Sequence, residues 1–277
     1  MATAIFELLG IDPALFMKAA FEITCLSLFF ICLTHSVVCH GWKRSLREFT
    51  AGFFLTACCE SLGVLSGAYV YPGFQFYIFS VPIANPASWI ALVYIIIELT
   101  NRLVYGPMAL ETYEADGHRI TKERFALFQG NILKTILVLA IIDSSLALVI
   151  DIILDPLATV YNWWIWVPAD EGINSVIAGT VDPYNFNQMV YLTTTQNPVY
   201  EYFSGVFTDG VRYPTRVFGI PLINFISWFV FVLIFTFQFR WVEFQNSWSE
   251  LKKTGVLWVM VLLDIPLLAI ALITPNI

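Results

Sequence analysis

Two aspartates, Asp151 and Asp155, are the residues best placed to do chemistry. They lie four positions apart near the end of an almost wholly apolar run that begins at about Ile132. On a helix, residues i and i+4 share one face about a turn apart, so both carboxyl groups point the same way. Ionisable groups at membrane depth are costly and usually face a protein interior or a wet cavity. The pair therefore predicts a buried site that can bind or move protons.

Other acidic residues also fall in apolar runs: Glu22, Glu60, Glu98, Asp143 and Asp264. Only Lys134 and Arg102 are predicted to lie near enough to pair with them. Burial disfavours the charged form of a carboxyl group, and a neighbouring carboxylate disfavours it further. We expect some of these groups to be neutral at pH 7, and a neutral acid beside a carboxylate is an acid–base pair. The same grouping could instead relay protons or form interhelical hydrogen bonds.

The composition is that of a membrane protein. The chain of 277 residues is 58% hydrophobic and 13% charged, with a mean hydropathy of +0.73, whereas soluble domains carry about 25% charged residues. No basic stripe exists to bind nucleic acid. The five cysteines all fall in apolar runs at spacings that match no zinc pattern, so we expect neither disulfides, nor a metal site, nor a cofactor.

Six apolar runs are long enough to cross a membrane as helices. We expect them at about residues 13–39, 48–70, 82–103, 131–154, 218–239 and 254–273. The predicted fold is an all-α, polytopic membrane helix bundle that forms one transmembrane domain over residues 1–277. Residues 167–216 are polar and contain no spanning run. We expect this segment to be a cap over the bundle or a docking surface for partner subunits.

The basic residues predict the orientation. Eleven of the 14 lysines and arginines lie in or beside the loops after the first, third and fifth spans, and three lie on the other side. By the positive-inside rule, both termini and the loop at 167–216 are extracytoplasmic. Asp155 then lies at the outer end of the fourth span, in a multi-pass protein of the cell membrane.

Polar and aromatic residues are predicted at the level of the aspartate pair in neighbouring spans. Glu60, Tyr69 and Tyr71 belong to the second span, Asn85 and Trp89 to the third, Trp164 and Trp166 follow the fourth, and Asn224 and Trp228 belong to the fifth. An aromatic pocket with carboxyl groups at its inner wall suits a long apolar ligand that has one reactive end.

Four motifs carry a resemblance to a known family. They are Glu60-x2-Gly63-x3-Gly67-x-Tyr69-x-Tyr71; Val81-Pro82 followed by Pro86 and Trp89; Asp151-x3-Asp155-Pro156 followed by Trp164-x-Trp166; and Gly219-x-Pro221-x2-Asn224-x3-Trp228. In this order they resemble the membrane carotenoid-biosynthesis hydratases, which include bisanhydrobacterioruberin hydratase and the bacterial γ-carotene and lycopene terminal hydratases. The resemblance covers spans two to five. The family joins its last two motifs by a short loop, whereas this chain has the insertion at 167–216.

The resemblance implies addition of water to the terminal double bond of an acyclic carotenoid, without oxygen or a redox cofactor. An acid protonates the less substituted carbon, a tertiary carbocation forms, and a base deprotonates the water that captures it. We expect Asp151 or Glu60 to be the acid, Asp155 the base, and Asn224 the group that positions the water. Cation-facing walls are expected from Trp89, Trp228 and Tyr69, with Tyr71, Trp164 and Trp166 completing the substrate pocket.

Structural roles compete with these assignments. Asp155-Pro156 could simply end a helix, Glu60 and Asn224 could be packing contacts, and tryptophans often anchor a span at the membrane interface. Asp143 is expected to bond a neighbouring helix, and Glu22, Glu98 and Asp264 are expected to be structural. His35 and His40 are expected to reach toward the interface.

Two other functions remain open. The chain could be a non-catalytic, pigment- or lipid-binding subunit of a larger membrane complex, with 167–216 as its docking surface. It could also be a proton-coupled carrier, although six spans without an internal repeat are unlike most transporters.

Overall fold

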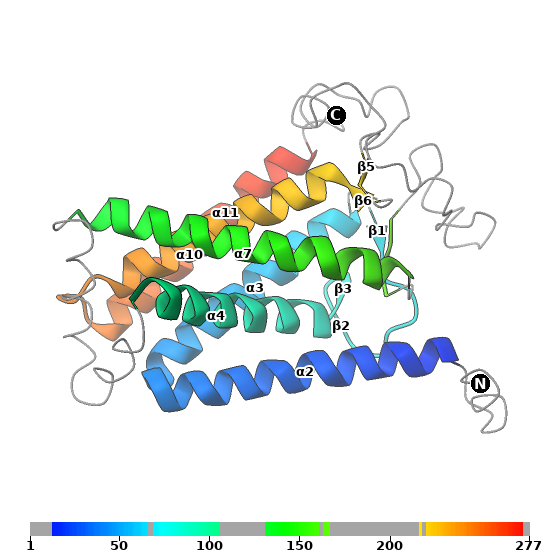
Figure 1. Ribbon diagram of the computed structural model, residues 1–277, viewed down its shortest axis with the longest axis horizontal. Helices are drawn as coiled ribbons and strands as arrows, with labels where there is room; N and C mark the ends of the chain where they lie inside the picture. Colours follow the sequence, from blue (N-terminus) through cyan, green and yellow to red (C-terminus); the bar gives the residue numbers. More distant parts are fainter. Residues whose placement is uncertain are drawn as a thin grey trace.

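Six long helices run back and forth along one axis and form a bundle (Figure 1). The computed structural model describes residues 13–65, 69–105, 131–160, 163–166, 216–217 and 220–273. Within these residues the helices are α2 (Pro13–His40), α3 (Trp42–Leu65), α4 (Ala84–Tyr105), α7 (Ile132–Val160), α10 (Leu222–Glu243) and α11 (Glu250–Ile273). The predicted all-α bundle is confirmed.

The membrane character is confirmed by the helices themselves. Among the described residues, five helices are long and apolar enough to cross a membrane, namely α2, α3, α4, α7 and α10. Large apolar side chains project from their outer faces, including Ile23 at 67%, Val38 at 79% and Leu103 at 65% exposure. Exposed apolar side chains of this kind are suited to contact with lipid tails. The sixth predicted span lies within α11, which packs against α3 and α10 (Figure 1).

Several helix ends differ from the prediction. The second helix begins at Trp42 and ends at Leu65, so Tyr69 is not helical. The fourth helix continues through Pro156 to Val160. The proline removes one backbone hydrogen bond, but the helix does not end there, so the interpretation of Asp155-Pro156 as a helix end is wrong. The fifth helix starts at Leu222, because Pro221 precedes it as the cap and belongs to a strand.

Three two-residue strand pairs lie at one end of the bundle, called here the strand end (Figure 1). They pair β1 (Tyr69–Val70) with β4 (Ile165–Trp166), β2 (Tyr77–Ile78) with β3 (Val81–Pro82), and β5 (Arg216–Val217) with β6 (Ile220–Pro221). In the first pair, Tyr69 lies opposite Trp166. This pairing joins the chain after α3 to the chain after α7, and so brings two distant motifs together.

Close helix contacts form the core of the bundle. Phe49, Leu55, Ile90 and Phe235, from α3, α4 and α10, are all buried in it. A Cβ atom at Gly52 would lie 2.2 Å from Ile90 Cδ1 and 3.0 Å from Phe235 Cζ, so a larger residue there would force these side chains to shift. This packing holds α3, α4 and α10 together, and with them the helix ends at the strand end of the bundle.

The helices alternate in direction, so α3 and α7 end where α4 and α10 begin, at the strand end (Figure 1). The turns from α2 to α3 and from α10 to α11 lie at the other end. Which end faces the cytoplasm stays a prediction from the basic residues. The insertion at 167–215, the loop at 106–130 and both chain ends lie outside the described residues.

Candidate functional site

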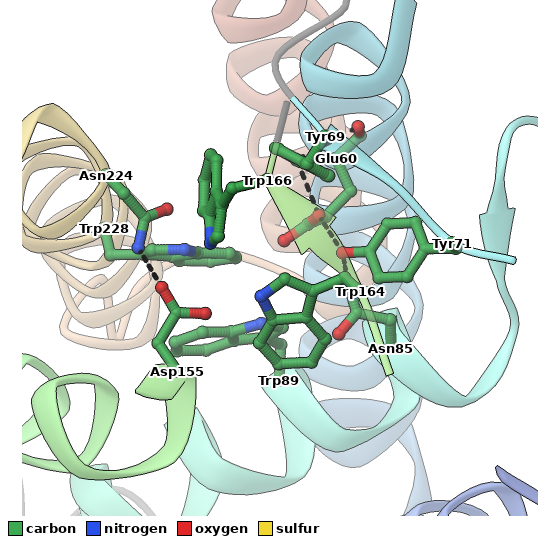
Figure 2. A pocket seen from close by; sticks show the side chains of 10 residues that line it. All are labelled: Glu60, Tyr69, Tyr71, Asn85, Trp89, Asp155, Trp164, Trp166, Asn224 and Trp228. Atoms are coloured by element: carbon green, nitrogen blue, oxygen red, sulfur yellow. Dashed lines mark hydrogen bonds between the residues drawn. The ribbon is translucent and has the colours of Figure 1, made fainter. Parts of the chain in front are cut away.

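A small pocket lies at the strand end, between the ends of α3 and α7 and the starts of α4 and α10 (Figure 2). Its lining consists of Glu60, Tyr69, Tyr71, Asn85, Trp89, Asp155, Trp164, Trp166, Asn224 and Trp228. The space open to a water-sized molecule is about 20 Å³. A volume of roughly 10–15 Å³ by this measure holds one water, so the pocket as it stands admits one or two waters.

Glu60 forms one side of the pocket. It lies on α3 and is 4% exposed. The hydroxyl groups of Tyr69 and Tyr71 donate hydrogen bonds to its Oε2 at 2.7 and 2.6 Å, and Asn85 Nδ2 donates to the Tyr71 hydroxyl at 2.8 Å. Figure 2 shows the other oxygen of Glu60 turned into the pocket. The carboxyl group therefore has one anchored and one available oxygen.

Both tyrosines act as donors. Burial, with the Glu60 carboxyl group nearby, raises the pKa of the Tyr69 and Tyr71 phenols well above their ordinary value. Their hydroxyl groups therefore keep their protons at every physiological pH. Gly63 makes room for this arrangement, since a Cβ atom there would lie 2.3 Å from the Tyr69 hydroxyl oxygen. The spacing of Glu60, Gly63 and Tyr69 thus has a direct steric reason.

Asp155 forms the opposite side of the pocket. It is 3% exposed and accepts a hydrogen bond of 2.7 Å from Asn224 Nδ2 at its Oδ2. The indole N–H of Trp164 faces the same carboxyl group (Figure 2). Asp151, one turn earlier on α7, accepts a longer bond of 3.4 Å from the same Asn224 nitrogen. Asn224 therefore bridges the two aspartates and lies closer to Asp155.

Aromatic rings close the space between the two carboxyl groups. Trp89 and Trp228 stack with ring centroids 3.6 Å apart and an interplanar angle of 12°. The Tyr69 and Trp166 rings meet edge to face at 4.8 Å, and Tyr71 meets Trp164 in the same manner at 6.0 Å. The carboxyl groups are thus shielded from bulk water by polarisable π faces.

Nine of the ten site residues predicted from the sequence line this pocket. The tenth, Asp151, is 3% exposed and reaches the pocket only through Asn224. Asn85 also lines the pocket, although no specific role was predicted for it. Its position three residues after Pro82, at the start of α4, was the available signal.

Asp143 belongs to a different arrangement. Arg240 Nε and Nη2 donate to its two carboxylate oxygens at 2.7 and 2.9 Å, and Arg240 Nη1 donates to Asn101 Oδ1 at 2.9 Å. The expectation that Asp143 bonds a neighbouring helix is confirmed. The expectation that only Lys134 and Arg102 could pair with the intramembrane acids is wrong. The long side chain of Arg240 turns from the last part of α10 back into the bundle.

Other acids within the helices also have structural partners. Glu22 accepts backbone N–H bonds from Gln75 and Phe76, and Asp264 accepts from Gln238, as a structural role predicts. Glu98 lies 2.8 Å from His40 Nε2. The His40 side chain is only 1% exposed, so the expectation that it reaches toward the interface is wrong. The helices bury it because Glu98 supplies a partner.

Within the described ranges, no group of three or more His, Cys, Asp or Glu side chains is arranged to hold a metal ion. The five cysteines are all free thiols. The chemistry open to the pocket through its own side chains is proton transfer between carboxyl groups across an aromatic, water-sized space.

Comparison with protein-family models gives no match for the chain, and comparison with curated proteins and with solved structures gives none either. The resemblance to the carotenoid hydratases therefore rests on the four sequence motifs.

Proposed function

We propose that the protein is an integral-membrane hydratase that adds water to the terminal double bond of an acyclic carotenoid or related polyisoprenoid. One observation carries the proposal. Glu60 and Asp155, from α3 and α7, face a shared water-sized space whose other walls are tryptophan and tyrosine rings. Hydration of an unactivated alkene needs an acid, a base, a water and a surface that tolerates a carbocation.

Glu60 suits the role of the acid. Its Oε2 accepts two phenol hydrogen bonds, which uses both lone pairs of a carbonyl-type oxygen. The proton of the neutral acid then resides on the other oxygen, which points into the pocket. When Glu60 loses that proton, the same two phenols stabilise the carboxylate, so the donors favour the transition state.

Asp155 suits the role of the base. The amide of Asn224 and the indole of Trp164 both present N–H groups to it, and such donors stabilise the charged form of a carboxyl group. Two carboxyl groups facing one dry space do not both ionise readily, so one of the pair is expected to hold a proton while the other is charged, and we assign that proton to Glu60. Asp151 does not line the pocket, so we assign it the role of positioning Asn224.

The reaction balances with these groups. The proton of Glu60 adds to the less substituted alkene carbon, the π electrons form the new C–H bond, and the dimethyl carbon becomes a tertiary cation. The water oxygen forms a C–O bond to that carbon, and its extra proton passes to Asp155. A proton returned through pocket water from Asp155 to Glu60 resets the site. Trp89 and Trp228 line the pocket, and we assign to them the role of stabilising the cation.

The small volume constrains how the substrate binds. A space for one or two waters does not hold a branched hydrocarbon end, so the reacting end enters only when an aromatic wall moves. The stacked pair Trp89–Trp228 fills the apolar side of the pocket. We expect the polyene to lie along the lipid-facing surface of the bundle, and we place the protein in the cell membrane.

Expression in a host that makes lycopene or a longer acyclic carotenoid tests the proposal. We expect a new pigment heavier by one water, and its loss in Glu60→Gln and in Asp155→Asn. Glu98→Gln is the matched control, because it changes a partly buried acid outside the pocket. Bound polyene without any hydrated product would instead favour a non-catalytic pigment-binding subunit. Full activity in both pocket variants would contradict the assignment.

A further inference from the structure

One polar group in the pocket is not used by the reaction as described. The indole nitrogen of Trp166 is buried and has no hydrogen-bond partner among the residues that the structure describes. The side chain is 6% exposed, and it lines the pocket. Figure 2 shows this nitrogen at the pocket edge of the ring, on the side of Trp228 and Asp155. A buried donor without a partner is costly, so its presence here calls for an oxygen atom that it can bind.

The backbone and the packing hold this donor in place. Trp166 belongs to β4, and its backbone pairs with Tyr69 of β1. Its ring packs in a cluster with Ile220 and Phe225, from β6 and the first turns of α10. The Tyr69 ring meets it edge to face. A donor fixed on three sides keeps its direction before anything binds, which is the condition for an effective positioning group.

Only a few kinds of ligand can bind the Trp166 N–H in this pocket. The pocket admits one or two waters, and an indole N–H donates but never accepts. The bound atom must therefore be an acceptor on a small molecule. The carboxyl groups on either side can accept the protons of that molecule, as a water requires. A ligand that offers only N–H donors to this space could not satisfy the Trp166 N–H.

We propose that the Trp166 N–H binds the oxygen of the water that attacks the carbocation and that becomes the hydroxyl group of the product. This inference rests on the proposed hydratase function and adds a water-positioning residue to it. The N–H accepts no proton and breaks no bond. It donates to one lone pair of the water, Asp155 accepts one of its protons, and the remaining lone pair is left to attack the cation.

A spectroscopic test is independent of catalysis. Ultraviolet resonance Raman spectra report whether an indole N–H is hydrogen bonded, and the spectrum of the wild type minus that of Trp166→Phe isolates this residue among the nine tryptophans. We expect the difference spectrum of a hydrogen-bonded indole in the purified, substrate-free protein. A spectrum of an unbonded indole would overturn the inference whether or not the protein is a hydratase.

A partition experiment tests the role in the reaction. Trp166→Phe keeps an aromatic ring and removes only the donor. In D2O, an acyclic carotenoid incubated with this variant should still take up deuterium at its end. Glu60 can still deuterate the alkene, and a cation that no water captures loses a proton from an adjacent carbon to Asp155, which restores a double bond with the deuterium in place. We expect hydrated product to fall roughly tenfold, as for loss of one hydrogen bond, so that the ratio of deuterium uptake to hydration rises. Trp163→Phe, which changes a tryptophan packed on Phe21 outside the pocket, is the control.

The outcomes separate the two proposals. Equal losses of deuterium uptake and hydration in Trp166→Phe would mean that the ring only supports the pocket, and would overturn the positioning role. A hydrogen-bonded indole in a wild type that makes no hydrated product would refute the hydratase function and leave the oxygen-binding site standing. Monodisperse Trp166→Phe protein in detergent shows that the comparison concerns a folded variant.

Discussion

The acids that line the pocket and the acids that pair with arginine at the other end of the bundle are held in different ways. At the strand end, Glu60 and Asp155 accept hydrogen bonds from tyrosine and asparagine, and no salt bridge among the described residues includes either of them. At the other end, called here the arginine end, Arg47 and Arg240 are the partners. Arg240 binds Asp143, and Arg47 binds Glu243 and Glu250.

The charge of the hydrogen-bond donor decides whether a carboxyl group can change its protonation state. A guanidinium stays charged at every relevant pH and fixes its carboxylate in the charged form with two directed bonds. Phenol and amide donors carry no charge, so the carboxyl group they hold can exist with or without its proton. The arginine pairs therefore join helices, whereas under the proposed function the pocket carboxyl groups at the strand end exchange protons.

The largest effect is expected at the strand end. Glu60→Gln and Asp155→Asn should lower the rate of hydration by about 10²- to 10⁴-fold, the usual contribution of a positioned acid or base. Both replacements keep the side-chain volume and leave groups that can hydrogen bond. The free energy of unfolding should therefore change by less than about 1 kcal/mol. Product chromatography measures the rate, and denaturant unfolding in detergent measures the stability. A variant that loses several kcal/mol of stability would contradict the prediction, because its loss of product would then reflect unfolding.

The next effect is expected at the arginine end. Arg240→Ala leaves the Asp143 carboxylate buried without its cation, so we expect a loss of about 3–5 kcal/mol in the free energy of unfolding. The double variant Arg240→Met, Asp143→Leu should recover most of that loss, because it removes the buried charges altogether. An Arg240→Ala protein as stable as the wild type would show that this ion pair does not clamp α10 to α7.

A smaller effect is expected from the donors around Glu60. Tyr71→Phe removes the shortest hydrogen bond to Glu60, at 2.6 Å, and with it the partner of Asn85. We expect a rate lower by roughly ten- to a hundredfold, because the bond strengthens when Glu60 becomes a carboxylate. Tyr94→Phe is the matched control, since Tyr94 is a buried tyrosine that bonds His35 in the other half of the bundle. Equal losses of rate in the two variants would show that the Tyr71 hydroxyl group does not assist the reaction through Glu60.

The smallest effect is expected at the rim of the arginine end. Glu250 binds Arg47 at 3.0 Å, but its side chain is 41% exposed. Partial burial would raise the pKa of Glu250, yet the hydrogen bond and charge of Arg47 outweigh it and hold the pKa below its ordinary value. The bridge then contributes its stability above the ordinary glutamate pKa of about 4.3 and loses it as the pH falls through the lower folded-state value.

Glu250→Gln should therefore cost at most about 1 kcal/mol at neutral pH. The difference from the wild type should shrink with added salt and vanish in acid as the pH falls through the lowered folded-state pKa of Glu250. Unfolding curves over this range measure it. A difference that grew toward low pH would contradict the direction of the shift.

The pocket was largely predictable because its residues combine rare placement with regular spacing. Carboxyl groups in apolar runs are scarce, so Asp155 and Glu60 stand out in the sequence, and helix periodicity places Asp151 one turn from Asp155. Asn224 and Trp228 share a helix face in the same way. These signals are local, and each needs only the assumption of a helix.

The features that could not be predicted depend on contacts between distant parts of the chain, which no local sequence pattern encodes. The pairing of Tyr69 with Trp166 joins two-residue strands, which are too short to show an alternating pattern. The pairing of Arg240 with Asp143 spans 97 positions, and a basic residue near a helix end can point either to the interface or into the bundle. The insertion and the orientation in the membrane stay predictions for the same reason.

Infrared spectroscopy of the substrate-free protein tests the contrast most directly, because the C=O stretch of a neutral carboxylic acid is distinct from the bands of a carboxylate. At neutral pH we predict a neutral-acid band in the wild type that is lost or shifted in Glu60→Gln and unchanged in Asp143→Asn. A band that is the same in the wild type, in Glu60→Gln and in Asp155→Asn would contradict the account, because the pocket would then hold no exchangeable carboxyl proton.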